Sequence, residues 1–352
     1  MTELSKLIEK AKQSKLFTAP KLEKDLARFL SNKGNYILKL AQEAVTNNIK
    51  HIYWVGSGNS WCNLYSGKYI LDKFTTISSD YYISYELIWR QPQRLNKDSI
   101  AFFASYSGST EDTVAALRYA KSRGARTVAI VNKADSLMGR EADNVIPYNS
   151  NALYILPLAV AYLFSLEIAR IQGAQVQKTI SEIFALPSLL GKIYNDEEER
   201  SKNLALQYKD KNLFYTFASG PLYGLGYKFG LTVFMENMRV HGSFIETSEF
   251  RHGPVEMLDR EKPVMVFLIG TDESRIMSER VINNISEKGA EIIKFDFADY
   301  GNMDPLLSPF LLMIPLQWFA VYSTLLRGIH DLDERALMGH GKMAKGEGIT
   351  WP

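Results

Sequence analysis

The sequence predicts an α/β protein with two tandem, doubly wound parallel-sheet domains behind an N-terminal helical segment. Apolar runs of about six residues recur, and each is followed by a turn of small polar residues and then by a helical pattern. These runs are apolar throughout, as expected for strands that are covered on both faces. The arrangement also repeats: turns begin at Gly56 and Ser105, 49 residues apart, and again at Ser219 and Gly270, 51 residues apart. This spacing indicates a tandem duplication of one α/β unit.

The first half begins with a charged helical segment, residues 1–48, in which we predict a helix over 20–47. The first sheet domain is predicted over residues 49–175. Its expected strands lie at 51–55, 100–104 and 127–131, and its expected helices at 63–74 and 111–123.

The second half follows a polar, helical connection over residues 173–203. The second sheet domain is predicted over 204–335, and residues 336–352 form a C-terminal tail. Its expected strands lie at 213–218, 264–269 and 291–295, with a helix ending near Met238 between the first two.

Two strongly apolar segments, residues 152–169 and 310–326, resemble membrane spans by composition. Each contains a proline and a polar interruption, such as Glu167 or Gln317, and both are short for a span. We therefore predict helices that are buried on all sides, either inside a domain or at a subunit contact, and no membrane partner.

The composition describes an ordinary globular protein of 352 residues, with 46% hydrophobic and 23% charged residues. A net charge of +2 gives no general attraction to nucleic acid, so we expect no such partner. The lone cysteine, Cys62, excludes an internal disulfide and a cysteine-rich zinc site. The N-terminus lacks an apolar signal core, which predicts a cytoplasmic protein. No cluster of metal ligands stands out, and we predict neither a metal nor a cofactor.

The turn after the second expected strand, Ser105-Tyr106-Ser107-Gly108-Ser109-Thr110, is typical of an anion site. It opens a helix, whose free N–H groups and dipole favour a negative charge. Hydroxyl side chains add donors for a small monophosphate, and the absence of a Walker lysine argues against nucleotide triphosphate hydrolysis. The alternative is simple N-capping by Ser, Thr, Glu111 and Asp112. The turn at residues 56–60 follows the neighbouring strand, so both turns are expected at one ligand.

Residues 234–256 bring several acid–base groups into one short segment. Carboxylates can remove protons and an imidazole can return them near neutral pH. The alternative is a solvated charged loop, but interspersed aromatic and aliphatic residues argue against a wholly exposed segment. The candidate groups are Glu236, Glu246, Glu249, His252 and Glu256.

Together these features resemble the sugar isomerase (SIS) domain family over about residues 49–335. The strongest matches are SYSGSTEDT, beginning at Ser105, and ETSEFRHGP, beginning at Glu246. SGPLYGLGYKFGL, GTDESR and LDER further resemble the fructosamine-6-phosphate deglycase subgroup, which is related to the isomerase half of glucosamine-6-phosphate synthase. The resemblance implies a homodimer or larger oligomer whose sites are shared across the subunit contact.

The resemblance also implies roles for individual residues. Glu236 matches the catalytic base, His252 matches the histidine for ring opening and proton transfer, and Glu249 matches a glutamate that orients its neighbours. Substrate and phosphate ligands are implied at Gly58, Asn59, Ser60, Ser105, Tyr106, Ser107 and Thr110.

Several positions depart from the family pattern. Ser248 replaces a glycine, Val233 replaces a lysine of the synthase, and neither Lys342 nor Lys345 aligns clearly with the synthase's Schiff-base lysine. The sequence contains no glutaminase domain, so glutamine-dependent transfer is not expected. The resulting prediction is a deglycase that releases an amine and a hexose 6-phosphate from a phosphorylated adduct. A phosphosugar aldose–ketose isomerase and a non-catalytic phosphosugar-binding regulator remain alternatives.

Overall fold

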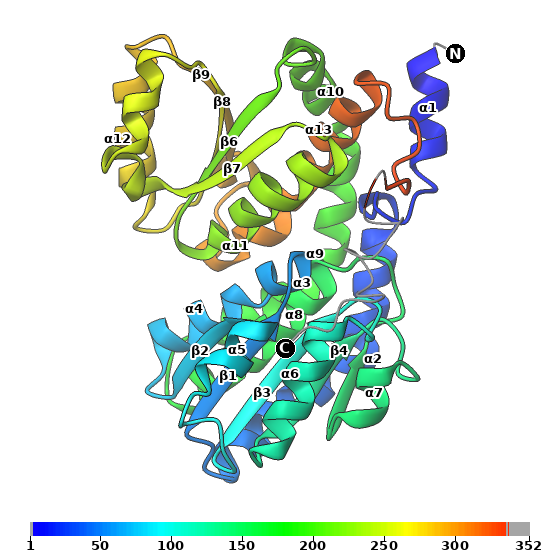
Figure 1. Ribbon diagram of the computed structural model, residues 1–352, viewed down its shortest axis with the longest axis vertical. Helices are drawn as coiled ribbons and strands as arrows, with labels where there is room; N and C mark the ends of the chain where they lie inside the picture. The colour runs from blue at the N-terminus through cyan, green and yellow to red at the C-terminus, as the bar shows by residue number, and fades with distance from the viewer. Residues whose placement is uncertain (1–2, 336, 338–352) are drawn as a thin grey trace. The chain divides into compact units, whose positions relative to one another are not determined.

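The computed structural model describes residues 3–335 and 337, which form two compact units (Figure 1). The first-sheet unit comprises residues 24–184 of the described chain. The second-sheet unit comprises residues 185–333 together with the chain before residue 24. The unit boundaries fall within two helices, α2 (Ala19–Thr46) and α9 (Gln177–Asp196).

The first-sheet unit is built on five parallel strands in the order β2-β1-β3-β4-β5. Every residue of β1 and β3 is buried, in agreement with their largely apolar sequences. The chain passes from β1 to one edge and then returns to β3 on the other side, so the sheet has its switch point between β1 and β3. The strands are β1 (His51–Gly56), β2 (Ser78–Ile83), β3 (Ser99–Ser105), β4 (Arg126–Val131) and β5 (Asn144–Pro147).

Helices cover both faces of this sheet (Figure 1). On one face, Trp54 of β1 stacks on Phe102 of β3, and both contact Phe164 of the buried helix α8 (Ile155–Ile171). Gly67 of α4 (Tyr65–Phe74) also approaches Trp54, where a Cβ atom would lie 2.5 Å from the indole ring. The opposite face packs against α5 (Ser84–Arg90), α6 (Glu111–Ser122) and α7 (Leu137–Glu141).

The second-sheet unit has four parallel strands in the order β7-β6-β8-β9. One face contacts α13 (Ser308–Leu326), against which α10 (Glu198–Gln207) packs, and the other face packs on α12 (Arg275–Ser286) and the 3-10 turn η3 (Thr247–Arg251). The helix α1 (Glu3–Ala11) lies against α13. The strands are β6 (Leu213–Ala218), β7 (His241–Glu246), β8 (Val264–Ile269) and β9 (Glu291–Asp296).

The connection from β6 to β7 is less regular than the single helix predicted. A 3-10 turn, η1 (Gly220–Leu222), leads into α11 (Tyr223–Tyr227) and then into a π-helical segment, η2 (Lys228–Asn237). Gly230 of η2 lies so close to β7 that a Cβ atom would be 2.4 Å from the Ser243 carbonyl oxygen. A π-helical segment is uncommon and frequently marks a functional region.

Both membrane-like segments fold as interior helices, as predicted. In α8, all residues from Ile155 to Ala169 are buried, and the buried Glu167 accepts hydrogen bonds from Arg170 and Gln42 at 2.7 Å each. Burial acts to raise the pKa of Glu167, but these hydrogen bonds outweigh it and the pKa lies below its ordinary value. One helical stretch, Pro305–Leu326, is long and apolar enough to cross a membrane, yet 94% of its apolar window is buried within the protein.

Candidate functional site

The turn at residues 105–110 joins β3 to α6 at the carboxyl edge of the first sheet. The buried Ser105 hydroxyl lies 2.7 Å from the Thr110 hydroxyl and accepts a hydrogen bond from the Gly108 amide at 3.1 Å. Gly108 has φ 62°, which only glycine adopts readily. Thr110 makes no side-chain capping bond to α6, so its hydroxyl faces Ser105 rather than the helix amides. The chain therefore curls around the N-terminus of α6 instead of simply capping it.

Two of the predicted ligands in this turn have side chains on the surface, whereas Tyr106 is anchored. Ser107 and Thr110 are exposed, and the Ser107 hydroxyl accepts a hydrogen bond from the Ser109 amide at 3.2 Å. The Tyr106 hydroxyl donates to Asn151 Oδ1 at 2.6 Å, and its carbonyl accepts from the Asn132 amide. Tyr106 thus fixes the turn to the loops that follow β4 and β5.

The second predicted turn lies one strand away at the same edge. Gly56 ends β1 directly beside Ala104 of β3, which brings the residues that follow both strands to one side of the switch point. Gly58 has φ 55° and begins the short helix α3 (Asn59–Cys62). Asn59 and Ser60 form the first turn of that helix and are partly buried. The structure therefore brings the two sequence-predicted turns to neighbouring strand ends.

A hydroxyl–carboxylate network that sequence reasoning missed joins these turns. The Ser57 hydroxyl donates to the Asp112 carboxylate and lies 3.0 Å from the hydroxyl of Ser84, at the start of α5. Ser84 in turn lies 3.0 Å from the hydroxyl of Thr113 on α6. The contacts tie together the residues after β1, β2 and β3. Asp112 and Thr113 belong to the SYSGSTEDT segment, so two of the four residues in this network lie within a motif that the sequence already indicated.

The corresponding edge of the second sheet has a different chemistry. Glu246, at the end of β7, accepts hydrogen bonds from the hydroxyls of Ser219 and Ser248 and from the Ser248 amide at 2.8 Å. Gly220 has φ 55°, and a Cβ atom there would meet the carboxylate of Asp272. Two carboxylates therefore stand where the first sheet presents hydroxyls, an arrangement unsuited to an anion. Glu246, a candidate acid in the sequence, serves here as the N-cap of η3.

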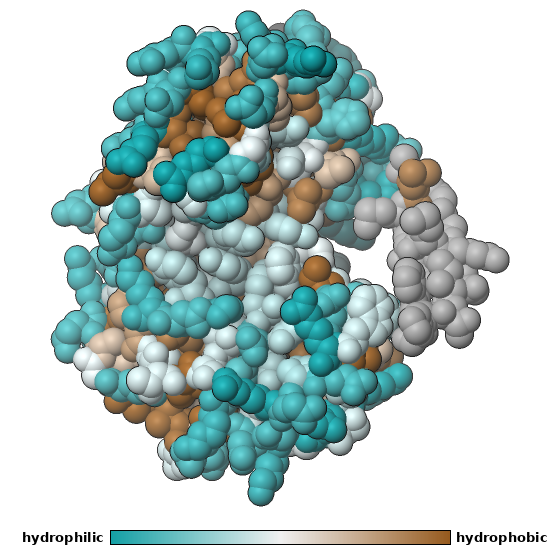
Figure 2. Space-filling view, turned by 60° about the vertical axis from the view of Figure 1, so that its left-hand side comes forward, coloured by the Kyte–Doolittle hydropathy of each residue, from teal (hydrophilic) through white to brown (hydrophobic). Residues whose placement is uncertain are grey.

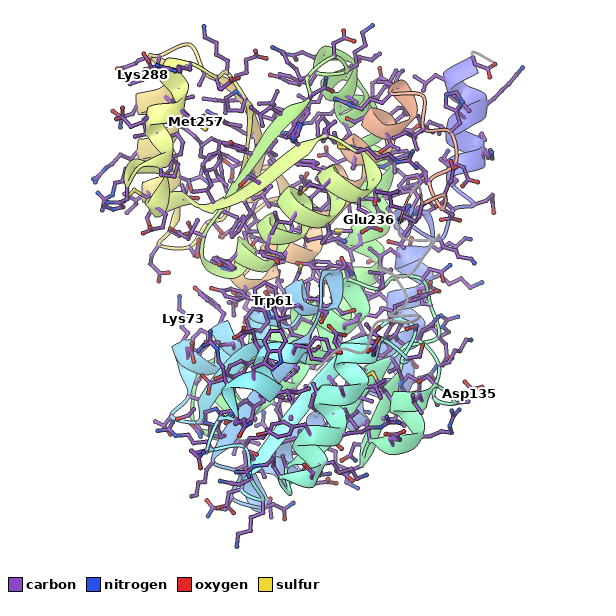
Figure 3. The ribbon with its side chains drawn as sticks, in the orientation of Figure 1. Trp61, Lys73, Asp135, Glu236, Met257 and Lys288 are labelled. Atoms are coloured by element: carbon purple, nitrogen blue, oxygen red, sulfur yellow. The ribbon has the colours of Figure 1, made fainter. Side chains whose placement is uncertain are left out.

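The remaining acid–base candidates of the second-sheet unit lie at opposite ends of β7. Glu236 is partly buried in the last turn of η2, before β7 begins. Glu249 and His252 follow β7 in and after η3; both are exposed, and the His252 ring accepts a hydrogen bond from Arg251 Nε at 3.1 Å. A six-residue strand spans about 20 Å. Figure 3 accordingly shows Glu236 well separated from Met257, five residues beyond His252.

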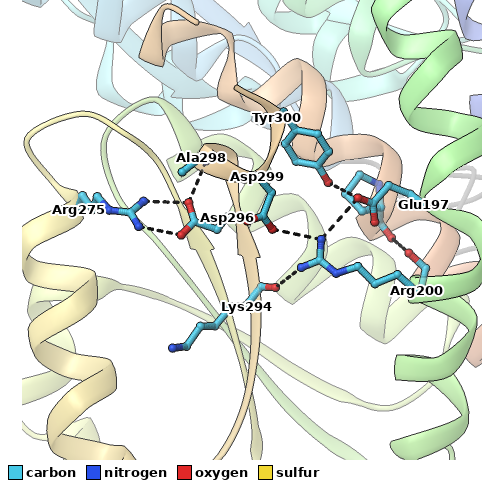
Figure 4. Close-up of polar contacts among 10 residues, drawn as sticks. Glu197, Arg200, Arg275, Lys294, Asp296, Ala298, Asp299 and Tyr300 are labelled. Carbon is cyan, nitrogen blue, oxygen red and sulfur yellow. Dashed lines mark hydrogen bonds and ion pairs between the residues drawn. The ribbon is translucent and has the colours of Figure 1, made fainter. Parts of the chain in front are cut away.

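The GTDESR segment, residues 270–275, stabilises the fold through an ion pair of its last residue, Arg275. Arg275 makes two 2.8 Å contacts with Asp296, whose carboxylate also accepts from the Ala298 amide at 2.9 Å (Figure 4). Burial acts to raise the pKa of Asp296, but the hydrogen bonds from Arg275 and Ala298 keep it below its ordinary value. The pair secures the end of β9 to the start of α12.

Two further predictions concern metals and the C-terminal lysines. Across residues 3–335 and 337, no group of three or more His, Cys, Asp or Glu side chains is arranged to hold a metal ion. Lys342 and Lys345 lie outside the described residues.

Comparison with known proteins places these features in a family. A model of the SIS domain matches residues 47–170. The chain is 31% identical to fructoselysine 6-phosphate deglycase of Escherichia coli (strain K12) over 90% of its own length and 93% of the relative's. It is 29% identical to fructosamine deglycase FrlB of Bacillus subtilis, over 74% of this chain and 80% of that one.

The fold comparison agrees. A Salmonella typhimurium protein assigned as a phosphosugar isomerase superposes with a TM-score of 0.80 at 23% identity, covering 87% of this chain and 96% of that one. The predicted fold class and the family resemblance are both confirmed. The chain belongs to the SIS-domain family that includes fructoselysine 6-phosphate deglycase.

Proposed function

We propose that this enzyme is a deglycase that acts on a 6-phosphorylated sugar–amino acid adduct and releases a hexose 6-phosphate and a free amine. The observation that supports the proposal is the hydroxyl-lined turn at residues 105–110, at the switch point of the first sheet. This turn lies in a chain that is 31% identical to fructoselysine 6-phosphate deglycase. Because a phosphorylated sugar does not cross a membrane unaided, we place the reaction in the cytoplasm.

The phosphate group is held by the turn itself in this proposal. Ser107 and Thr110 donate hydroxyl hydrogen bonds, Ser105 shapes the turn from beneath, and the N-terminus of α6 supplies a favourable dipole. Tyr106 contributes through its backbone while its hydroxyl is engaged by Asn151. Gly58, Asn59 and Ser60, one strand away, lie alongside the sugar. Binding energy from the phosphate orients the distant reacting carbons.

Glu236 acts as the general base in the proposed chemistry. For an adduct at C1, the carboxylate removes a proton from C1, the bonding pair becomes a C1–C2 double bond, and the C2 oxygen is protonated to give an enaminol. Protonation at C2 yields an imine at C1. Water then adds to C1, the C1–N bond breaks, and the amine leaves. For an adduct at C2, the proton is removed from C2 and returned at C1. The imine then forms at C2, and its hydrolysis gives the ketose phosphate.

His252 opens the sugar ring and moves protons between oxygens, and Glu249 orients the loop that carries it. Within one chain, Glu236 and His252 lie at opposite ends of β7, so we propose that His252 reaches the substrate bound to a second copy. The enzyme is then a homodimer or larger. On the face drawn in Figure 2, apolar side chains reach the surface of the second-sheet unit between polar ones. Light scattering at assay concentration is expected to give at least twice the chain mass, and a fully active monomer would contradict this assembly.

The amine is identified by a substrate screen. Adducts of lysine, of other amino acids and of simple amines, attached at C1 or C2 of the 6-phosphorylated sugar, are incubated with the enzyme. We expect one class of adduct to release amine and hexose 6-phosphate in equal amounts. An aldose–ketose isomerase would instead interconvert plain sugar phosphates and leave all adducts intact, and a binding module would bind without turnover of either.

A further inference from the structure

A cavity of about 490 Å³ lies at the amino edge of the second sheet, away from its strand-end turns. The segments that precede β6 and β7 form two of its walls, and the chain after α13 forms the third. Its charged lining residues are Lys209, Asp210, Arg239 and Arg327. A volume of this size suits a small metabolite.

Most of the charged residues that line the cavity are cations. Three cations, Lys209, Arg239 and Arg327, face a single carboxylate, that of Asp210. Lys209 is exposed and makes neither an ion pair nor a side-chain hydrogen bond within the described chain. By contrast, Lys211, two residues on and outside the cavity, pairs with Glu291. Cations thus outnumber carboxylates among the residues that line the cavity.

Arg327 contributes a guanidinium group that is held in place by neutral partners. Its Nη1 donates to the Ser323 carbonyl at 2.9 Å, and its Nη2 donates to the carbonyls of Tyr208 and Lys211 at 3.1 and 2.6 Å. Its Nε is buried and has no hydrogen-bond partner among the described residues. Burial lowers the pKa of Arg327, and the charge of Asp210 offsets this only in part. Within the part of the chain that the structure describes, the fold thus fixes a cation at the cavity through backbone carbonyls and not through a carboxylate.

Arg239 is held at the cavity by an unusual backbone. Its φ of 54° lies in the left-handed region, which arginine rarely adopts. The residues on either side are pinned, because the Met238 amide donates to the Val233 carbonyl and the Val240 amide donates to the Phe234 carbonyl. Such strain persists when surrounding contacts enforce it and is concentrated at functional positions.

We propose that this cavity is a second anion site that binds the phosphate dianion of a small phosphate monoester. A phosphate monoester carries close to two negative charges at pH 7, and the lining offers it three cationic side chains. Arginine offers paired donors suited to phosphate oxygens, and Met238, Val240, Leu326 and Ile329 provide apolar contact for the body of the ligand. None of the residues assigned to the substrate lines this cavity. Arg239 follows Glu236 by three residues, so the proposed ligand would bind next to the helix end that carries the proposed base.

The site is tested by calorimetric titration of the full-length protein with inorganic phosphate and with glucose 6-phosphate. The background is Ser107→Ala/Thr110→Ala, which removes the proposed substrate phosphate contacts. We expect a binding event to remain in that background. Lys209→Glu removes an exposed cation, and Arg239→Asn removes a charge while keeping a residue that tolerates positive φ. Each is expected to weaken binding about tenfold or more, equivalent to about 1.4 kcal/mol.

The matched control is Lys288→Glu, which makes the same charge change in the same unit on the loop after α12, at the far edge of the view in Figure 3. It is expected to leave the dissociation constant within about twofold, because the Debye length at physiological salt is only about 8 Å. Tighter binding of glucose 6-phosphate than of inorganic phosphate would support recognition of the ester. Loss of all binding in the Ser107→Ala/Thr110→Ala background, or equal weakening by Lys288→Glu, would overturn the site. Turnover of the 6-phosphorylated adduct by the single variants Lys209→Glu and Arg239→Asn is measured separately. Failure of the proposed cavity site is thereby distinguished from failure of the proposed deglycase activity.

Discussion

Glu236→Gln is expected to reduce kcat by at least about a hundredfold with little change in KM. The amide keeps the size and much of the hydrogen-bonding capacity of the carboxylate but cannot accept the carbon-bound proton. General-base contributions of about 10²–10⁴ set this scale, and an effect confined to kcat marks a group used in the transition state. Steady-state release of amine measures it.

Three comparisons sharpen the assignment of Glu236. Substrate deuterated at the abstracted position is expected to show a primary isotope effect with the wild-type enzyme. Glu256→Gln, an exposed acid of the neighbouring segment, is the matched control and is expected to retain near-normal turnover. His252→Ala is expected to slow turnover, but less on a substrate already in open-chain form. Near-normal kcat in Glu236→Gln would reassign the residue to packing within η2 and shift the search for the base to Glu249.

Ser107→Ala/Thr110→Ala is expected to raise KM for the 6-phosphorylated adduct about a hundredfold or more while leaving the fold intact. Hydrogen bonds to a charged group each contribute about 1.5–3 kcal/mol, so two of them account for a change of this size. Both side chains are exposed, and their removal leaves no cavity in the core. Initial rates over a range of substrate concentrations, with circular dichroism as the check on folding, give the result.

The control for the phosphate turn is Ser109→Ala, an exposed hydroxyl of the same turn to which no ligand role is assigned. Its KM is expected to stay close to that of the wild-type enzyme. The double variant is also expected to leave the weak turnover of an unphosphorylated adduct unchanged. If the unphosphorylated adduct were as good a substrate for the wild-type enzyme, the turn would not be the phosphate site.

The strands that the sequence revealed are the interior ones. β1, β3, β4, β6 and β8 are central and covered on both faces, so their sequences are largely apolar, and all five were predicted within two residues. The missed strands, β2, β5 and β7, each lie at the edge of a sheet. An edge strand such as β7, with the sequence HGSFIE, is only partly buried and needs no apolar run. The edge strand β9 was predicted from the apolar residues Ile292, Ile293 and Phe295 in its sequence.

Local sequence patterns predicted part of the candidate site, whereas the rest depends on tertiary contacts. The turns after β1 and β3 were predictable, because a hydroxyl-rich segment between an apolar strand and a helix is a local pattern. The contact of Ser57 with Asp112 was not, because it joins residues 55 apart and depends on how α6 packs beside β1. The π-helical form of η2 was missed for the same reason, since its close approach to β7 at Gly230 is a tertiary contact.

The most direct test of the proposed deglycase activity is a product balance. Wild-type enzyme and Glu236→Gln are incubated with the 6-phosphorylated adduct selected by the screen, and the free amine and the hexose 6-phosphate are quantified over time. We predict equal amounts of both products from the wild-type enzyme and almost none from the variant. Saturable binding of every adduct in the screen without release of either product, or conversion of sugar phosphates without release of amine, would contradict the proposed function.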